Sequence, residues 1–286
     1  MTGPKKTTEL RTGIVLALLL GSAACGDASE PDAQSHTISN GPQQWTLPVA
    51  LREISGLALT QDERLLAVTD ELAVVYELDF NEGGLVKRFG FGQPVARDDF
   101  EGITVAADRV WLMTSDGVLY SAPEGENGEF VDYDRVDTGI GQDCELEGLA
   151  TSADGESLLL LCKNGRDKKK LRLHEWRIDD GELSSRKLPE KAMEAEAGSN
   201  KLRPTGIARD PQRGTWAILA GPQHIVFDVD GALDLNGAIM RLDAARHRQA
   251  EGIEITRDGR LLLADEGGKG RATLAVYWLD NGNNKH

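Results

Sequence analysis

A five-fold repeat is the feature of this sequence that most limits the folds it can adopt. A glycine, preceded by a polar or acidic residue and followed by leucine or isoleucine, recurs along the chain. The copies are Ile54-Ser55-Gly56-Leu57, Phe100-Glu101-Gly102-Ile103, Leu146-Glu147-Gly148-Leu149, Pro204-Thr205-Gly206-Ile207 and Ala250-Glu251-Gly252-Ile253. Successive glycines are 46, 46, 58 and 46 residues apart. A nearly fixed period of this length indicates an array of similar structural units.

Each repeat carries the pattern of short antiparallel strands. An apolar stretch follows the glycine, then a polar turn such as 61–63, then a second apolar stretch such as 65–68. A third stretch follows in most repeats, as at 74–79, and a fourth as at 85–89. Such runs separated by turn residues are typical of strands. Four strands in a unit of this length are typical of a β-propeller blade.

The strand count predicts how the ring closes. The fifth repeat ends after its third strand, while residues 45–49 precede the first repeat without a unit of their own. We therefore predict an all-β fold, a five-bladed β-propeller with four antiparallel strands per blade, in which the N-terminal strand closes the last blade and removes open sheet edges. The propeller is expected at 43–282, with blades near 53–98, 99–144, 145–202, 203–248 and 249–282 plus 43–49. The longer interval is attributed to an insertion at 190–200, a short helix or mobile loop that we interpret as a solvated excursion, with a lid as the alternative.

The N-terminus predicts export. Residues 1–24 carry Lys5, Lys6 and Arg11 before an apolar run at 14–20, the layout of a secretory signal. That run is shorter than the ~20 residues of a membrane-spanning helix. Small residues before Cys25 resemble a bacterial lipobox, so Cys25 is expected to be lipidated and to begin the mature protein, with 25–42 as a flexible polar tether.

Gly26 after the cysteine resembles the outer-membrane sorting pattern of enteric bacteria, which predicts an outer-membrane lipoprotein facing the periplasm or the exterior. Ser22 departs from the usual lipobox, so ordinary signal cleavage to a soluble periplasmic or secreted protein is the alternative.

The charge of the chain excludes some partners. The formal net charge is −15, and removal of residues 1–24, which carry a net +2, makes it −17. Nucleic acid requires clustered Lys and Arg, and the one basic cluster, at 166–170, lies in a polar turn. We expect no nucleic-acid partner, membrane contact only through the lipid, and a monomer. An acidic surface is compatible with divalent cations or with solubility alone.

Cys144 and Cys162 remain after export and lie within one repeat. An oxidising compartment allows them to pair. Nothing resembling Cys-x-x-Cys accompanies them, so a structural disulfide, worth ~3 kcal/mol, is favoured over a metal or redox site.

The repeat also predicts where polar side chains gather. Because the first strand of each blade lines the channel of a propeller, the residues just before the glycines should ring one mouth of it. This inner ring contains Ser55, Glu101, Glu147, Thr205 and Glu251, with Glu53, Asp99, Glu145, Arg203 and Gln249 two residues earlier. The second strands end at the same face and bring an outer ring of Asp70, Glu71, Asp116, Asn164, Asp265 and Glu266.

Carboxylates this close together repel one another unless a cation lies among them, and hard oxygen ligands suit Ca²⁺ better than Zn²⁺. We therefore predict a calcium site formed from Glu101, Glu147, Glu251, Asp70 and Asp265. The alternative is structural: the side chain caps backbone N–H groups of the neighbouring blade and the glycine allows a turn with positive φ. Serine and threonine at two of the five inner positions agree with this alternative.

Four motifs resemble a known family. They are Glu53-Ile54-Ser55-Gly56-Leu57, Val68-Thr69-Asp70-Glu71, Tyr76-Glu77-Leu78-Asp79 and Asp99-Phe100-Glu101-Gly102-Ile103. Together they are similar to the SdiA-regulated family of bacterial exported propellers, distantly similar to NHL-repeat proteins, and the resemblance covers roughly residues 45 to 280. It implies a five-bladed propeller with bound calcium and no established activity. Arg203-Pro204-Thr205-Gly206 replaces an acidic pair, so a metal ligand from the fourth blade is not expected.

Three classes of function are then open. The first is a non-enzymatic, calcium-stabilised module that binds a protein or a small molecule at the channel mouth. The second is a metal-dependent hydrolase of the lactonase or esterase kind, which needs an open metal position and a base for water. A phosphoesterase ranks last, because only Arg203 and Arg97 are candidates to grip phosphate. There is no Gly-x-Ser-x-Gly elbow, and the five histidines lack metal-ligand spacing and are expected mostly at the surface or in turns.

Overall fold

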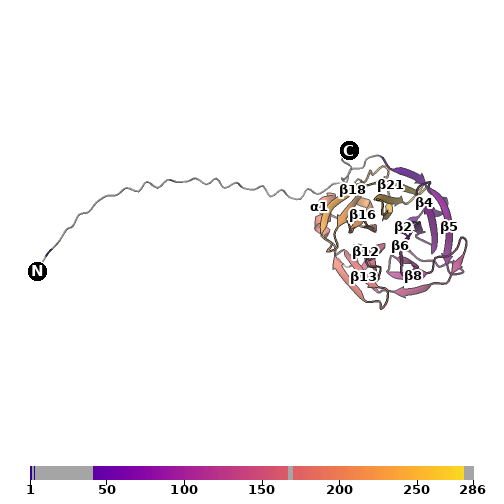
Figure 1. Ribbon diagram of the computed structural model, residues 1–286, viewed down its shortest axis with the longest axis horizontal. Coiled ribbons are helices and arrows are strands. Elements are labelled where there is room, and N and C mark those ends of the chain that lie inside the picture. The colour runs from indigo at the N-terminus through magenta and orange to yellow at the C-terminus, as the bar shows by residue number, and fades with distance from the viewer. Residues whose placement is uncertain (2, 4–40, 167–169, 280–286) are drawn as a thin grey trace. The chain divides into compact units, whose positions relative to one another are not determined.

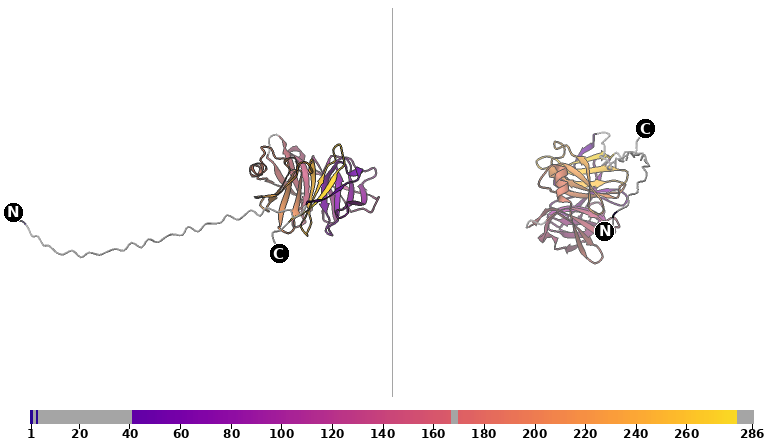
Figure 2. Two further views of the ribbon diagram at one scale, coloured as in Figure 1. Left: turned by 90° about the horizontal axis from the view of Figure 1, so that it is seen from above. Right: turned by 90° about the vertical axis from the view of Figure 1, so that its left-hand side faces the viewer.

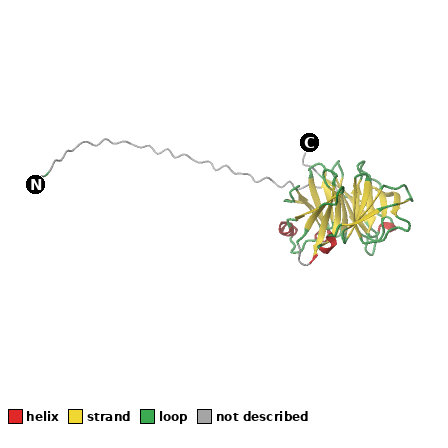
Figure 3. Cartoon of the chain, turned by 90° about the horizontal axis from the view of Figure 1, so that it is seen from below, coloured by secondary structure: helices red, strands yellow, loops and turns green. Residues whose placement is uncertain are grey.

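The computed structural model describes residues 1, 3, 41–166 and 170–279. The predicted signal peptide, Cys25 and nearly all of the tether lie outside the described residues. Five antiparallel sheets stand around a central axis (Figure 1), which confirms the five-bladed β-propeller. Strands make up most of this unit (Figure 3), and side views show them running between its two faces (Figure 2).

Each blade is built from four antiparallel strands. Blade 1 holds β2 (Ile54–Leu59), β3 (Leu65–Thr69), β4 (Val74–Asp79) and β5 (Gly84–Phe91); blade 2 holds β6 (Phe100–Ala106), β7 (Arg109–Thr114), β8 (Val118–Ala122) and β10 (Asp134–Asp137). Blade 3 holds β11 (Cys144–Thr151), β12 (Ser157–Gly165), β13 (Arg172–Arg177) and β14 (Leu183–Lys187); blade 4 holds β15 (Gly206–Asp210), β16 (Thr215–Ala220), β17 (Ile225–Val229) and β18 (Leu235–Arg241). Blade 5 holds β19 (Ala250–Ile255), β20 (Arg260–Asp265), β21 (Thr273–Trp278) and β1 (Gln43–Thr46).

The N-terminal strand closes the ring as predicted. Strand β1 pairs antiparallel with β21, from Gln43 opposite Val276 to Thr46 opposite Thr273. Beyond β1, the buried Leu47 donates its N–H to the Ala272 carbonyl oxygen at 2.8 Å. The outer edge of β21 is therefore covered by a strand from the other end of the sequence.

Two elements depart from the simple repeat. In the insertion between blades 3 and 4, α1 (Glu190–Ala197) ends at Gly198 in the left-handed conformation and buries Met193. In the β8–β10 connection, β9 (Phe130–Val131) pairs parallel with β5, so blade 1 gains a fifth strand that the repeat did not predict. Among the described residues, no helix is long and apolar enough to cross a membrane.

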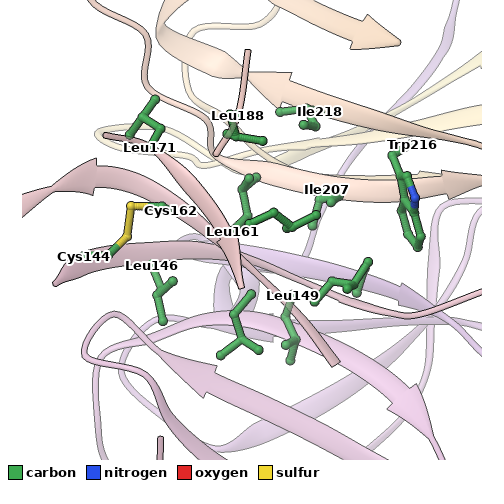
Figure 4. Packing of buried hydrophobic residues seen from close by; sticks show 14 of the residues in the cluster. Cys144, Leu146, Leu149, Leu161, Cys162, Leu171, Leu188, Ile207, Trp216 and Ile218 are labelled. Carbon is green, nitrogen blue, oxygen red and sulfur yellow. A yellow bond between two sulfur atoms is a disulfide. The ribbon is translucent and has the colours of Figure 1, made fainter. Parts of the chain in front are cut away.

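The hydrophobic core fills the space between neighbouring blades. Figure 4 shows part of it, with Leu149 and Leu161 of blade 3 near Ile207 of blade 4. Trp111 of blade 2 and Trp176 of blade 3 meet edge to face, with ring centres 5.7 Å apart. Each blade thus buries both of its faces, which the apolar runs of the inner strands allow.

A disulfide joins Cys144 at the start of β11 to Cys162 near the end of β12, with a Cα–Cα distance of 5.8 Å (Figure 4). It ties together the ends of the two strands nearest the axis in blade 3.

The repeat glycines lie where the inner strands of adjacent blades come closest. A Cβ on Gly102 would be 2.7 Å from Leu149 Cβ, and one on Gly206 would be 2.9 Å from the Glu251 carbonyl oxygen. None of the five glycines has a positive φ. The expectation of a left-handed turn at these positions is therefore wrong. Glycine recurs because the narrow centre of the ring has no room for a side chain.

Candidate functional site

In blades 1, 2, 3 and 5, the residue before the repeat glycine is turned out of its sheet by a local irregularity. In blade 2, Phe100 is paired with Thr114 and Gly102 with Met113, so Glu101 has no opposite residue. The same shift occurs in blades 1, 3 and 5, at Ser55, Glu147 and Glu251. A bulge of this kind leaves one residue unpaired and re-aims its side chain. The repeated motif is therefore a bulge followed by a close approach of backbones.

These side chains surround a small cavity at the centre of the propeller. All five inner strands line it, each with its repeat glycine and the residues on either side, so Ser55, Glu101, Glu147, Thr205 and Glu251 all contribute. The free volume is about 10 Å³, close to the minimum that one water molecule requires. The cavity therefore has room for one bare ion or one water molecule and not for an organic substrate.

Burial raises the pKa of all three glutamates that line the cavity, and charge repulsion adds to it. For Glu101 and Glu251, repulsion from the Glu147 carboxylate is the second-largest cause of the raised pKa, after burial. The pKa of Glu251 rises to about 8. Burial also raises the pKa of Glu147, which is only 3% exposed, although Lys163 opposes the change. The three carboxylates therefore do not all stay ionised at neutral pH without further positive charge.

Lys163, on β12, supplies positive charge to this ring. Its ammonium group forms an ion pair with Oε1 of Glu147, and its side chain is 21% exposed. Burial acts to lower the pKa of Lys163, but the carboxylates of Glu147, Glu251 and Glu101 raise it overall. Sequence analysis missed this residue because the repeat has no basic pattern here. The equivalent positions, two residues after the partner of each repeat glycine, are Asp70, Ser115, Gly221 and Glu266.

The two hydroxyl residues of the inner ring behave differently. Thr205 donates its hydroxyl to the Ala250 carbonyl oxygen at 2.9 Å and accepts the Gly221 N–H at 3.2 Å. It therefore caps the backbone of blade 4 and of its neighbour, as the structural alternative expects. The Ser55 hydroxyl oxygen and Oε2 of Glu251 are buried with no hydrogen-bond partner among the described residues. Unpaired buried oxygens of this kind call for a ligand, an ion or a water molecule.

The other two predicted metal ligands, Asp70 and Asp265, are not among the described residues that line the cavity. Asp70 lies half-buried near the mouth. Its pKa rises to about 6, first through burial and then through repulsion from nearby carboxylates, those of Glu53, Glu71, Glu266 and Asp99. Of the remaining outer-ring residues, Asp116 is exposed and pairs with Arg166 at 2.7 Å.

Asp265 is buried in a separate hydrogen-bonded network. Its Oδ2 lies 2.7 Å from Nδ1 of His247, and Nε2 of that histidine lies 2.5 Å from the Tyr277 hydroxyl. His247 has no exposed surface, and His174 is also buried. His247 lies in the turn region between β18 and β19, where its backbone N–H donates to the Asp243 carbonyl oxygen at 2.8 Å. The expectation of a surface or turn position is wrong for His174, which lies within β13 and is buried by tertiary contacts that spacing does not reveal.

The donor set suits one hard cation, since it offers three carboxylates and the unpaired Ser55 hydroxyl, all oxygen ligands. In residues 41–166 and 170–279, however, no three His, Cys, Asp or Glu side chains lie close enough together to hold a metal ion. The Glu147 carboxylate is moreover already paired with the Lys163 ammonium group. A metal would have to draw the glutamates together and displace Lys163.

Comparisons with known proteins show similarity in fold and not in sequence. No protein-family profile and no curated protein matches the sequence. Among solved structures, Myxococcus xanthus glutaminyl cyclase has a TM-score of 0.56 at 12% identity, covering 85% of this chain and 97% of that one. A luciferin-regenerating enzyme has a TM-score of 0.53 at 9% identity, with 83% and 95% covered. PQQ-bound aldose sugar dehydrogenase from Streptomyces coelicolor has a TM-score of 0.50 at 14% identity, with 85% and 98% covered. These neighbours are β-propellers with different activities, so the fold leaves the activity open.

Proposed function

We propose that this protein is an exported, calcium-binding β-propeller that serves as a ligand- or partner-binding module of the cell envelope. The observation that carries this proposal is the size of the central cavity, about 10 Å³ among Glu101, Glu147 and Glu251. A space of this size accepts one ion but no organic substrate. The resemblance of the repeat motifs to the SdiA-regulated family agrees with a bound calcium and implies no established activity.

The charge of the mouth favours a cationic ligand or a partner with a basic surface. The carboxylates of Glu53, Glu71, Glu266 and Asp99 all act on Asp70. We propose that calcium binds the carboxylates of the inner ring, while the carboxylates of the outer ring face the partner. A predominantly acidic rim attracts positive charge and repels anionic phosphoesters, so the phosphoesterase alternative receives no support.

The proposed location is the outer membrane, with Cys25 lipidated and residues 25–42 separating the propeller from the lipid. The soluble periplasmic or secreted form is the alternative, and Cys25 decides between them.

The test is a calorimetric titration of chelator-treated full chain with Ca²⁺, Mg²⁺ and Zn²⁺, followed by a hydrolysis screen. The metal-loaded protein is offered lactones, carboxylic esters and phosphoesters. Calcium binding without turnover supports the binding module. Metal-dependent turnover, lost in Glu147→Gln, would instead establish the hydrolase alternative, with the substrate held in the mouth above the metal. If none of the three metals binds, the calcium part of the proposal fails.

A further inference from the structure

We infer that Lys163 is the resident counter-cation of the central glutamate ring, which neutralises the buried Glu147 in the metal-free protein and must leave it before a metal can bind. The first half of this inference stands on contacts within the chain. The second half rests on the proposed calcium-binding function.

The position of Lys163 is fixed by its neighbours in the sheet. In blade 3, Gly148 is paired with Leu161 and Leu146 with Cys162, so the bulge places Glu147 beside the last part of β12. Cys162, directly before Lys163, is held to β11 by the disulfide. The backbone of Lys163 is thus anchored beside Glu147. Lys163 is not among the described residues that line the cavity, but its ammonium group reaches the Glu147 carboxylate.

Lys163 pairs with the glutamate whose side chain is the most buried. Glu147 is the most buried of the three glutamates, and it is the one that Lys163 contacts. Glu251 retains a buried Oε2 with no partner among the described residues. An ionised buried carboxylate with no opposite charge nearby is strongly unfavourable, so removal of its partner destabilises the fold. Lys163 therefore compensates the charge of the most buried glutamate when no metal is bound.

The same contact makes Lys163 a competitor of any metal. A divalent cation needs the Glu147 oxygen that the ammonium group occupies, and the two positive charges repel each other across a cavity of about 10 Å³. The affinity for Ca²⁺ is thus set partly by how readily Lys163 leaves. In the four other blades the equivalent residues are Asp70, Ser115, Gly221 and Glu266, so at this position only blade 3 carries a cation.

The first experiment measures thermal unfolding of the chelator-treated full chain. Lys163→Met keeps the length and the apolar stem of the side chain but removes its charge. Lys170→Met is the matched control, because Lys170 lies in the same blade, is exposed and pairs loosely with Glu190 at 3.4 Å. We expect Lys163→Met to melt several degrees below Lys170→Met, or to remain unfolded, and Lys163→Met with Glu147→Gln to recover most of the loss.

Recovery is expected because a neutral amide in place of Glu147 needs no counter-charge. If Lys163→Met and Lys170→Met melt together, or if the double variant does not recover, Lys163 is not the resident counter-cation.

The second experiment adds millimolar Ca²⁺ to the same proteins and follows the melting temperature together with calorimetric affinity. Displacement predicts that Ca²⁺ binds Lys163→Met at least about tenfold more tightly than the wild type and raises its melting temperature more. Equal affinities for the wild type and Lys163→Met would overturn the competition. If Ca²⁺ binds neither protein while the double variant still recovers, the counter-cation stands and the proposed calcium binding is what fails.

Discussion

Gly206 offers a test of why glycine recurs in every blade. A Cβ at this position would lie 2.9 Å from the Glu251 carbonyl oxygen and 2.8 Å from Ile253 Cγ2, both in blade 5. The φ of Gly206 is not positive, so alanine suffers no backbone strain there. The carbonyl oxygen belongs to the backbone and has no rotamer to change. Gly206→Ala is therefore expected to push the inner strands of blades 4 and 5 apart.

The size of the effect follows from two opposing contributions. Overpacking of a tight site destabilises by roughly 1–3 kcal/mol. The loss of backbone freedom in the unfolded chain offsets about 0.4–1 kcal/mol of this. We expect the free energy of unfolding to fall by ~1–2 kcal/mol and the melting temperature to fall by ~2–8 °C, since each kcal/mol shifts a domain of this size by ~2–4 °C.

The assay is thermal unfolding followed by circular dichroism, with Gly231→Ala as the control. Gly231 lies between β17 and β18 of the same blade, has no positive φ, and a Cβ there would meet no atom within 4 Å. The control should melt within ~2 °C of the wild type or slightly above it. If Gly206→Ala melts as high as Gly231→Ala, close approach is not the reason for the glycine.

Three further predictions concern a half-buried carboxyl, the disulfide and the N-terminus. Burial raises the pKa of Glu254 from 4.5 to about 8, so its protonated form stabilises the fold fully below pH 4.5 and this contribution is lost as the pH rises through about 8. The wild-type melting temperature should therefore fall more steeply across that window than that of Glu254→Gln, and parallel curves would contradict the burial of this group. Joint replacement of Cys144 and Cys162 by alanine should lower the free energy of unfolding in urea by ~3 kcal/mol, because the bridge spans a sequence separation of 18. A loss below about 1 kcal/mol would mean that the bridge adds little to the other contacts between β11 and β12. Mass spectrometry of the mature protein should find a diacylglyceryl group on Cys25 as the first residue, whereas a free, unmodified terminus would retire the lipoprotein proposal.

The architecture could be predicted because its constraint acts on all blades alike. Gly56 and Gly102 each lie against the inner strand of the next blade, and the same crowding acts at the other three repeat glycines. A shared steric requirement leaves a period in the sequence, and the count of strands then places β1 in blade 5. The repeat also predicts that Glu101, Glu147 and Glu251, which each precede a repeat glycine, lie together at the centre of the propeller.

Features that belong to one blade leave no such period. Lys163 and His247 each gain their role from a single contact, with Glu147 and with Asp265. Whether a side chain near a strand end faces the axis or a neighbouring blade depends on a shift of one residue, because successive side chains point to opposite faces. The bulge that turns Glu147 toward the cavity is such a shift, whereas the structural alternative drawn from the motif places a left-handed turn at the glycine.

The central claim is that the three cavity glutamates form one cation site, and calorimetric titration with Ca²⁺ tests it most directly. The proteins are the chelator-treated full chain, Glu147→Gln, Glu251→Gln, and Glu182→Gln as a control with an exposed carboxyl outside the cavity. We predict one Ca²⁺ per chain in the wild type and in Glu182→Gln, and markedly weaker binding in both cavity variants with unchanged circular dichroism. Unchanged affinity in both cavity variants would falsify the claim, and no binding to any of the four proteins would contradict it as well.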